Sequence, residues 1–255
     1  MSRPVFTIEE RDRVRNGLLE MARNDPRLVA GAIVGSMARG GGDRWSDLDL
    51  TFGLADGTAV IDVLIGWTRD LEQKFNAVHL FDLPFLSTIY RVFLFPGNLQ
   101  VDLSFTPIAD FGALGPDFQL IFGQTVERLH IPPPSDQYLF GLAVHHAVRA
   151  RFCIARGRLW QAEYWISEVR DQALSLACLR YGLEPRNGRG YDGLPVEITR
   201  RFTDALVRSI DCEELLRALG CSIEALLGES TEVREFASKV EAQLYGLLST
   251  KWPEA

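Results

Sequence analysis

The feature that most constrains the fold is one stretch, residues 33–54, IVGSMARGGGDRWSDLDLTFGL. An apolar run ends in a loop of small and charged residues, and a second apolar run follows that carries Asp47 and Asp49. Val, Ile and Phe in alternating positions are typical of half-buried strands. The stretch therefore predicts a strand, a glycine-rich loop and a second strand with two carboxylates at alternate positions.

Side chains alternate along a strand, so Asp47 and Asp49 are expected on one face, with Cα atoms about 6–7 Å apart. Two carboxylates that face each other in apolar surroundings repel and take up protons unless a cation lies between them. The pair therefore indicates a divalent metal site.

A third carboxylate, Asp102, lies in the run LQVDLSF, whose neighbours Val101, Leu103 and Phe105 favour burial. If this strand lies beside the strand of Asp47 and Asp49, three carboxylates meet at one edge of a sheet. Such a cluster is suited to Mg²⁺, which binds a few carboxylates together with waters and substrate phosphates.

The loop before the aspartate pair has the residues of a phosphate site. Gly35 lets a phosphate approach the backbone, and Ser36 offers a hydroxyl and an N–H. Residues 40–42 are glycines, and Arg39 and Arg44 add positive charge. Together with metal-binding carboxylates, this loop predicts nucleoside triphosphate chemistry.

The first half of the chain alternates helix and strand patterns, which predicts an α+β fold with a mixed sheet flanked by helices. Thr7 and Glu10 have capping-box spacing at the start of a first helix. A second helix is expected over residues 58–75, and strands over residues 28–36, 48–54, 77–83, 89–95 and 99–105.

Prolines 132–134 end this pattern, and Ser135 or Asp136 can cap the helix that follows. From there on the periodicity is helical. We expect an all-α bundle with helices over residues 138–156, 159–182, 195–209, 211–227 and 231–249. The chain is thus divided into domains 1–134 and 135–255.

The composition of the chain disfavours several classes of partner. A formal charge of −7 disfavours a nucleic-acid partner and suits a cationic small molecule. No apolar run reaches the roughly 18 residues of a membrane span, and the first residues lack a signal-peptide core. We therefore expect a cytoplasmic protein without membrane contact, whose four cysteines are reduced and do not bind metal.

Gly35-Ser36, followed after ten residues by Asp47-Leu48-Asp49 and later by Asp102, resembles the signature of the DNA polymerase β-like nucleotidyltransferase superfamily. The resemblance covers about 70 residues. It implies that Asp47 and Asp49 bind Mg²⁺ with ATP, that Gly35 and Ser36 hold phosphate, and that Asp102 is a metal ligand, a general base, or both.

The two-part plan is similar to that of the aminoglycoside and lincosamide nucleotidyltransferases. This similarity implies an enzyme that transfers AMP from ATP to a hydroxyl of an antibiotic or a comparable small molecule, a function in antibiotic resistance. Aspartate at position 102 departs from the glutamate of some of those enzymes, which leaves the identity of the base open.

The helical half is expected to bind the acceptor. Trp160, Glu163, Tyr164 and Arg170 lie on neighbouring faces of the predicted helix 159–182 and are the candidate contacts. The alternative is a solvated helix surface, on which Glu163, Ser167 and Arg170 form a network of their own.

Two further motifs are interpreted as structural. Residues 188–193, GRGYDG, match a dinucleotide-binding pattern, but they follow a helix rather than a strand, which indicates an ordered loop. His145 and His146 lack a metal-binding spacing, and one of them is expected in the core or at an interface.

Other functions remain open from the sequence. The same chemistry could adenylylate a partner protein, as in nucleotidyltransferase antitoxins, or the chain could be a catalytically silent nucleotide-binding protein. ATP is not distinguished from other nucleotides, and the helical half could form a homodimer interface.

Overall fold

A computed structural model gives the fold and describes residues 5–40, 42–128 and 132–249, without the side chain of Arg39. The chain divides into two compact units, Met1–Ile131 and Pro132–Ala255, which we call the N-terminal and the C-terminal unit. The division falls between residues 131 and 132, at the start of the proline run rather than at its expected end between residues 134 and 135.

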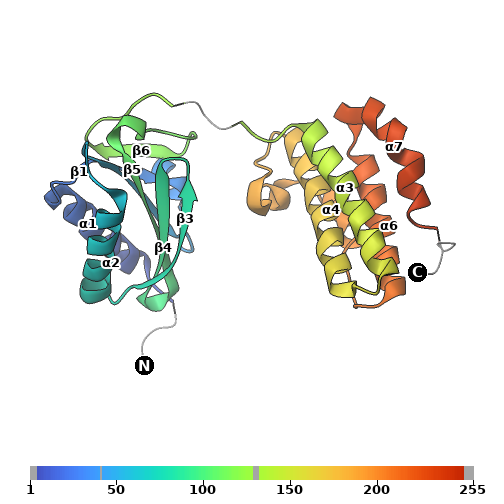
Figure 1. The fold of residues 1–255 in the computed structure, drawn as a ribbon, viewed down its shortest axis with the longest axis horizontal. Coiled ribbons are helices and arrows are strands. Elements are labelled where there is room, and N and C mark those ends of the chain that lie inside the picture. Colours follow the sequence, from blue (N-terminus) through green and yellow to red (C-terminus); the bar gives the residue numbers. More distant parts are fainter. Residues whose placement is uncertain (1–4, 41, 129–131, 250–255) are drawn as a thin grey trace. The chain divides into compact units, whose positions relative to one another are not determined.

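The described part of the N-terminal unit contains two α-helices and six strands (Figure 1). The capping box is present: the N–H of Glu10 donates to Thr7 Oγ1 (3.2 Å), and the N–H of Thr7 donates to Glu10 Oε2 (2.7 Å). The elements are α1 (Ile8–Asn24), β1 (Leu28–Val34), β2 (Leu48–Leu54), α2 (Val60–Phe75), β3 (Val78–Phe85), β4 (Thr88–Phe95), β5 (Leu99–Pro107) and β6 (Phe118–Phe122).

The strands form one sheet in the order β3-β4-β5-β2-β1-β6. β2 and β5 are parallel, and the other neighbouring pairs are antiparallel, which confirms the expected mixed sheet. The sequence does not predict β6, because its five residues follow the turn-forming run GALGPD and show no regular alternation.

One face of the sheet, which we call the covered face, carries the core of the N-terminal unit. Leu48, Leu50 and Phe52 of β2 and Leu103 and Phe105 of β5 are each no more than 1% exposed. They pack in one cluster with apolar residues of α1 and α2, and both helices lie on the same side of the sheet (Figure 1).

The opposite face, which we call the polar face, presents the alternate residues of the same strands. Asp49 and Thr51 of β2 lie beside Asp102 and Ser104 of β5 in register. A small apolar cluster of Ala30, Ala32 and Phe111 covers the β1 side of this face.

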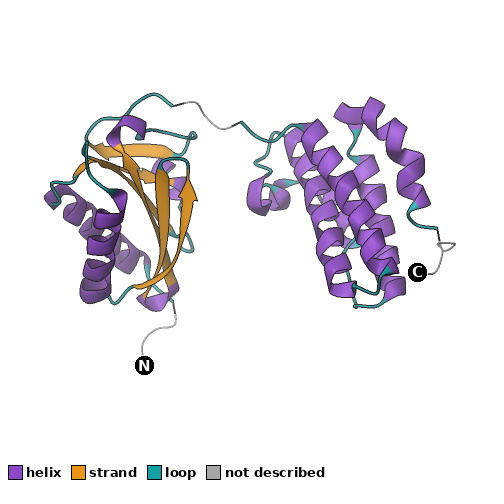
Figure 2. Ribbon diagram, in the orientation of Figure 1, coloured by secondary structure: helices purple, strands orange, loops and turns teal. Residues whose placement is uncertain are grey.

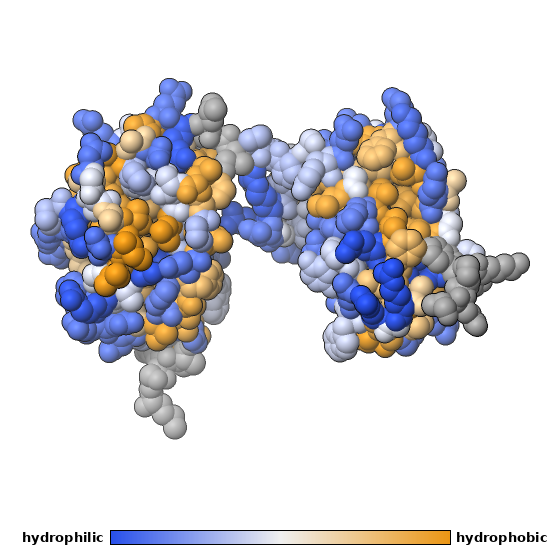
Figure 3. Space-filling model, in the orientation of Figure 1, coloured by the Kyte–Doolittle hydropathy of each residue, from blue (hydrophilic) through white to orange (hydrophobic). Residues whose placement is uncertain are grey.

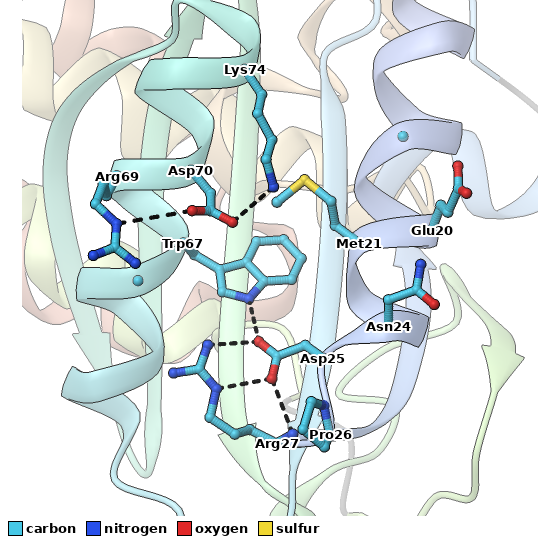
Figure 4. Close-up of a pocket in the computed structure, with 12 residues that line it drawn as sticks. Glu20, Met21, Asn24, Asp25, Pro26, Arg27, Trp67, Arg69, Asp70 and Lys74 are labelled. Atoms are coloured by element: carbon cyan, nitrogen blue, oxygen red, sulfur yellow. Dashed lines mark hydrogen bonds and ion pairs between the residues drawn. The ribbon is translucent and has the colours of Figure 1, made fainter.

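A cavity of about 430 Å³ lies between α1 and α2 on the covered side (Figure 4). Asp25 accepts hydrogen bonds there from Arg27 Nε (2.9 Å) and Nη2 (2.7 Å) and from Trp67 Nε1 (3.0 Å). These bonds, chiefly those from Arg27, hold the pKa of Asp25 at about 2. Asp25 thus ties the end of α1 to α2 through a fully satisfied carboxylate.

The regular elements among the described residues of the C-terminal unit are all helices, and all the described strands belong to the N-terminal unit (Figure 2). Ser135 caps the first helix as expected, since its Oγ accepts from the N–H of Tyr138 (3.2 Å). Fully buried alanines on α3 and α4 allow close packing of these two helices. The helices are α3 (Asp136–Ala155), α4 (Leu159–Arg180), α5 (Val196–Thr203), α6 (Cys212–Gly228) and α7 (Arg234–Gly246).

Two helix boundaries differ from those expected. The helix expected over residues 195–209 ends at Thr203, because the chain turns before Asp211, which caps α6 by accepting from the N–H of Glu214 (2.9 Å). The last helix begins at Arg234, after a single 3₁₀ turn at Thr231–Val233, and ends at Gly246.

Hydrophilic side chains surround apolar patches on the visible face of each unit (Figure 3). The edge strand β3 contributes exposed apolar side chains, among them Val78, Phe81 and Leu83. Within the described ranges, no helix is long and apolar enough to cross a membrane.

Candidate active site on the polar face

Asp49 and Asp102 are direct neighbours on the polar face. They are register partners in the parallel pair β2–β5, and neighbouring strands lie about 4.7–4.9 Å apart. Both residues are half-buried, where like charges repel more strongly than in water. The fold thus places side by side the two strands from which the sequence predicts a carboxylate cluster.

Asp47 differs from the expectation, because it lies in front of β2, which begins at Leu48. A turn directly precedes Asp47, and it contains a hydrogen bond from the N–H of Ser46 to the carbonyl oxygen of Asp43 (3.3 Å). Of the two aspartates, only Asp49 therefore lies within the strand, and the shared face of Asp47 and Asp49 stays a prediction. Asp47 still acts on the site, since its charge contributes to a raised pKa at Asp102.

The surroundings of Asp102 favour its protonated form. Burial is the largest cause of its raised pKa, the hydrogen bond donated by Gln100 Nε2 to Oδ1 (3.1 Å) opposes the rise, and Asp47 adds to it. A carboxylate with a raised pKa accepts a proton more readily near neutral pH. Asp102 therefore has the electrostatic setting of a general base.

Gly35 packs directly against Asp49. β1 ends at Val34, and Gly35 has φ +69°, a conformation that favours glycine. A Cβ at this position would collide with Asp49 Oδ2. Two constraints therefore favour glycine at position 35, the positive φ of the backbone and the close approach of the Asp49 carboxylate.

The loop differs from the expected phosphate cradle in two respects. Its first part is a 3₁₀ helix, Gly35–Arg39, and the N–H of Gly35 donates to the carbonyl oxygen of Asp117 (3.2 Å), so it is not free for a phosphate. Ser36 is exposed at the start of this helix. Arg44 lies over the ring of Trp45 (4.6 Å to its centroid), and the side chain of Arg39 lies outside the described residues.

Two residues of this face are not predicted from the sequence, Tyr90 and Arg128. Burial raises the pKa of the Tyr90 hydroxyl, Arg128 opposes the rise and Asp49 adds to it, so both charges act on Tyr90. The segment of Arg128 crosses the polar side of the sheet, where the N–H of Val126 donates to the carbonyl oxygen of Phe111 (2.8 Å). Arg128 is thus a cation within electrostatic reach of Tyr90.

The donors present fit Mg²⁺. Asp49 and Asp102 offer carboxylate oxygens side by side, and a bound cation would relieve the repulsion between two half-buried like charges. Among the described residues, no group of three or more His, Cys, Asp or Glu is arranged to hold a metal ion on its own. A magnesium site here would be completed by waters and substrate phosphates, as Mg²⁺ prefers.

The four residues predicted for the acceptor lie on α4. Trp160 is 77% exposed, and Tyr164 packs edge-on against Trp165 (4.9 Å between centroids). Ser167 Oγ donates to Glu163 Oε1 (2.8 Å), whereas Arg170 donates to Asp171. Of the network expected on a solvated helix surface, the bond between Ser167 and Glu163 is present, whereas Arg170 pairs outside it. These contacts do not identify a binding surface on α4.

The two motifs interpreted as structural are ordered parts of the C-terminal unit. Residues 188–193 run from the end of one 3₁₀ turn, Arg186–Gly188, through a second, Tyr191–Gly193, and Tyr191 Oη donates to the carbonyl oxygen of Asp171 (2.8 Å). His146 is buried against Trp165 (5.0 Å between centroids), and burial lowers its pKa. His145 is exposed on the same helix.

No known family model matches the chain, and no curated protein matches its sequence. Among solved structures it is similar to the crystal structure of an aminoglycoside 6-adenyltransferase from Bacillus subtilis. The identity is 13% and the TM-score 0.42, over 96% of this chain and 100% of that chain. At these values the likeness assigns neither substrate nor cofactor, so a function has to be inferred from the residues of this chain.

Proposed function

We propose that the chain is a magnesium-dependent nucleotidyltransferase that moves AMP from ATP to a hydroxyl of a small molecule, such as an aminoglycoside or lincosamide antibiotic. The observation that carries this proposal is the register pairing of Asp49 and Asp102 on parallel strands, with Gly35 packed against Asp49. An apolar sheet has no structural need for such a pair, whereas triphosphate chemistry requires carboxylates that hold a metal ion.

Asp47, Asp49 and Asp102 are the residues that would hold Mg²⁺ in this proposal, with Asp49 and Asp102 side by side in register. When bound, the ion supplies neutralisation of the triphosphate charge. The half-burial of Asp49 and its contact with Gly35 fix the direction in which its oxygens are presented.

Asp102 is the proposed general base. It takes the proton of the acceptor hydroxyl while the oxygen attacks the α-phosphorus of ATP in line, and the bond from that phosphorus to the leaving pyrophosphate breaks. Burial and the charge of Asp47 raise the pKa of Asp102, which makes this proton transfer more favourable.

Positive charge for the triphosphate is assigned to three arginines. Arg39 and Arg44 belong to the segment between β1 and β2, and Arg128 acts electrostatically on Tyr90, as Asp49 does. Ser36 adds an exposed hydroxyl beside Gly35. Because Arg44 lies over Trp45, its binding to a phosphate would require the side chain to leave that ring.

The acceptor is assigned to the C-terminal unit, and the formal charge of −7 favours a cationic molecule. Trp160 and Tyr164 are the exposed aromatic candidates for contact with it, at 77% and 53% exposure. Glu163 is the candidate partner for an amino group of the acceptor. Arg170 is the fourth candidate contact on α4.

Pyrophosphate release from ATP and Mg²⁺ tests the proposal. The assay is run against a panel of aminoglycosides, lincosamides and other hydroxyl-bearing small molecules, with Asp49→Asn as the matched variant. We expect acceptor-dependent release that the variant loses while it keeps its fold by circular dichroism. Full activity in Asp49→Asn would refute the assignment of the site.

The same purified protein can be used to test the two alternative functions. Labelled ATP and cell lysate would yield a labelled protein band if the acceptor is a partner protein. Nucleotide binding without pyrophosphate release, across the panel and the lysate, would instead identify a catalytically silent nucleotide-binding protein.

A further inference from the structure

Arg11 is a buried arginine that extends from α1 to the turn in front of Asp47. It is 3% exposed, whereas Arg13 on the same helix is exposed. Its Nη1 donates to the carbonyl oxygens of Asp43 (2.6 Å) and Ser46 (3.0 Å). One nitrogen atom thus holds both ends of the turn 43–46.

The turn is closed internally by the side chains of its two end residues. Ser46 Oγ accepts from the N–H of Asp43 (2.9 Å) and donates to Asp43 Oδ1 (3.1 Å). Asp43 Oδ1 also accepts from the N–H of Trp45 (2.8 Å). Because these bonds are reciprocal, the turn behaves as one rigid piece that moves only if its outside attachment to Arg11 gives way.

Burial of the Arg11 guanidinium costs free energy of hydration, and the hydrogen bonds to the turn must offset it. A guanidinium that is removed from water needs hydrogen bonds to offset its lost hydration. Among the described residues, Arg11 Nε has no hydrogen-bond partner, so the compensation comes from the two carbonyl oxygens at Nη1. An apolar side chain could fill the same space without that cost, but it could not hold the turn.

The turn leads directly into the candidate site. Ser46 is followed by Asp47 and then by the first residue of β2, so the position of the turn sets the position of Asp47. On the outer side of the turn, Trp45 is 66% exposed and Arg44 lies over its ring, so among the described residues these side chains give the turn no comparable attachment.

We propose that Arg11 is a positioning residue that fixes the turn 43–46 and, through it, Asp47. The part of this inference that concerns nucleotide binding rests on the function proposed above, whereas the part that concerns the turn does not. Arg11 lies on the helix-covered side of the N-terminal unit and acts through the turn, without contact to substrate.

The first experiment measures the turn itself in the full chain. Hydrogen exchange of a peptide covering residues 42–48 is followed by mass spectrometry in wild type, Arg11→Met and Arg11→Lys, with residues 50–54 as an internal reference. Arg11→Met lacks the donors, and Arg11→Lys keeps a charged donor on a side chain one bond shorter. We expect exchange of residues 42–48 to rise at least about tenfold in Arg11→Met and less in Arg11→Lys.

The second experiment measures binding of Mg²⁺ with a non-hydrolysable ATP analogue by calorimetry in the same proteins. We expect Arg11→Met to weaken the affinity at least about tenfold and Arg11→Lys to restore part of it. Arg15→Met is the matched control, because Arg15 lies one turn further along α1 and pairs with Asp12 (3.0 Å). It should leave both measurements unchanged.

Each of the two experiments tests one part of the proposal. Unchanged exchange in Arg11→Met, or a rise that is equal over residues 42–48 and 50–54, overturns the anchoring of the turn. A loosened turn with unchanged affinity overturns the link to Asp47. If wild type itself binds no nucleotide, the proposed function fails, and exchange alone decides the role of Arg11.

A second variant covers the case in which Arg11→Met does not fold. Ser46→Ala removes the two hydrogen bonds of the Ser46 hydroxyl with Asp43 without touching α1, and it should also raise exchange of residues 42–48. Protection as strong as in wild type would overturn the description of the turn as one rigid piece.

Discussion

The covered and the polar face of the sheet are made from the same strands but have opposite chemistry. Leu50 and Phe52 of β2 are at most 1% exposed in an apolar core, whereas Asp49 between Leu48 and Leu50 stands beside a second carboxylate. The covered face stabilises the fold, and the polar face holds groups that repel one another. We therefore assign the polar face to the proposed function and the covered face to stability.

The largest effect should come from the covered face. Phe52 packs against Trp67 (5.2 Å) and Phe105 (5.6 Å), so Phe52→Ala should lower the free energy of unfolding by about 3–5 kcal/mol. Urea unfolding measures the change. The control from the polar face is Thr51→Ala, for which we expect about 1 kcal/mol or less. Equal losses would erase the contrast between the two faces.

Carboxylates on the two sides of the sheet should respond to pH in opposite directions, and Asp25 is the stronger case. Its folded pKa of about 2 lies below its ordinary value, so it stabilises the fold above the unfolded pKa and loses this effect as the pH falls towards 2. Asp25→Asn should cost about 2 kcal/mol at pH 7.

Unfolding of wild type and Asp25→Asn between pH 7 and pH 2 gives the measurement, and the difference between them should shrink below about pH 4. Asp70→Asn, which removes an exposed pair with Lys74 (2.9 Å), is the control and should cost less than about 1 kcal/mol. A difference that stays constant down to pH 2 would contradict the role given to Arg27 and Trp67.

Gly35 and Gly40 form a matched pair for the junction with Asp49. Both have positive φ, +69° and +70°, but a Cβ at Gly40 meets nothing within 4 Å. Alanine at either position should cost about 1–2 kcal/mol from the backbone. Only Gly35→Ala should also displace Asp49 and weaken binding of Mg²⁺ with ATP, measured by calorimetry. The same affinity in both variants would show that the contact does not matter.

The smallest effect should have the opposite sign. Burial and Asp47 raise the pKa of Asp102, so its ionised form destabilises the fold, and the favourable protonated form is lost as the pH rises through the folded pKa. Asp102→Asn should therefore raise the free energy of unfolding by about 1 kcal/mol or less at pH 7 in EDTA. Exposed Asp56→Asn is the control, and a loss of stability in Asp102→Asn would be contrary to this reasoning.

Alternation along single strands allowed much of the sheet to be predicted. The apolar residues of β2 and β5 identify their covered face, and Asp49 and Asp102 are then assigned to the other. Asp47 lies outside this pattern, because β2 begins at Leu48 and the hydrogen-bonded turn 43–46 directly precedes Asp47. Such bonds depend on the reciprocal positions of Asp43 and Ser46, which alternation does not record.

The contributors to the site that were not predicted come from distant parts of the chain. Arg11 stands in an arginine-rich helix, and nothing in its periodicity distinguishes it from Arg13 or Arg15. Tyr90 and Arg128 act with Asp49 only because the chain returns across the sheet. The roles of these residues depend on tertiary structure, which helical and strand periodicity do not record.

The most direct measurement is Mn²⁺ binding, as a stand-in for Mg²⁺, followed by electron paramagnetic resonance in the presence of ATP in wild type and Asp49→Asn. We predict that wild type depletes free Mn²⁺ beyond what ATP alone binds, and that the variant loses this effect at least about tenfold in affinity. Equal depletion by the two proteins, with both folded, would contradict a metal–nucleotide site at the paired carboxylates.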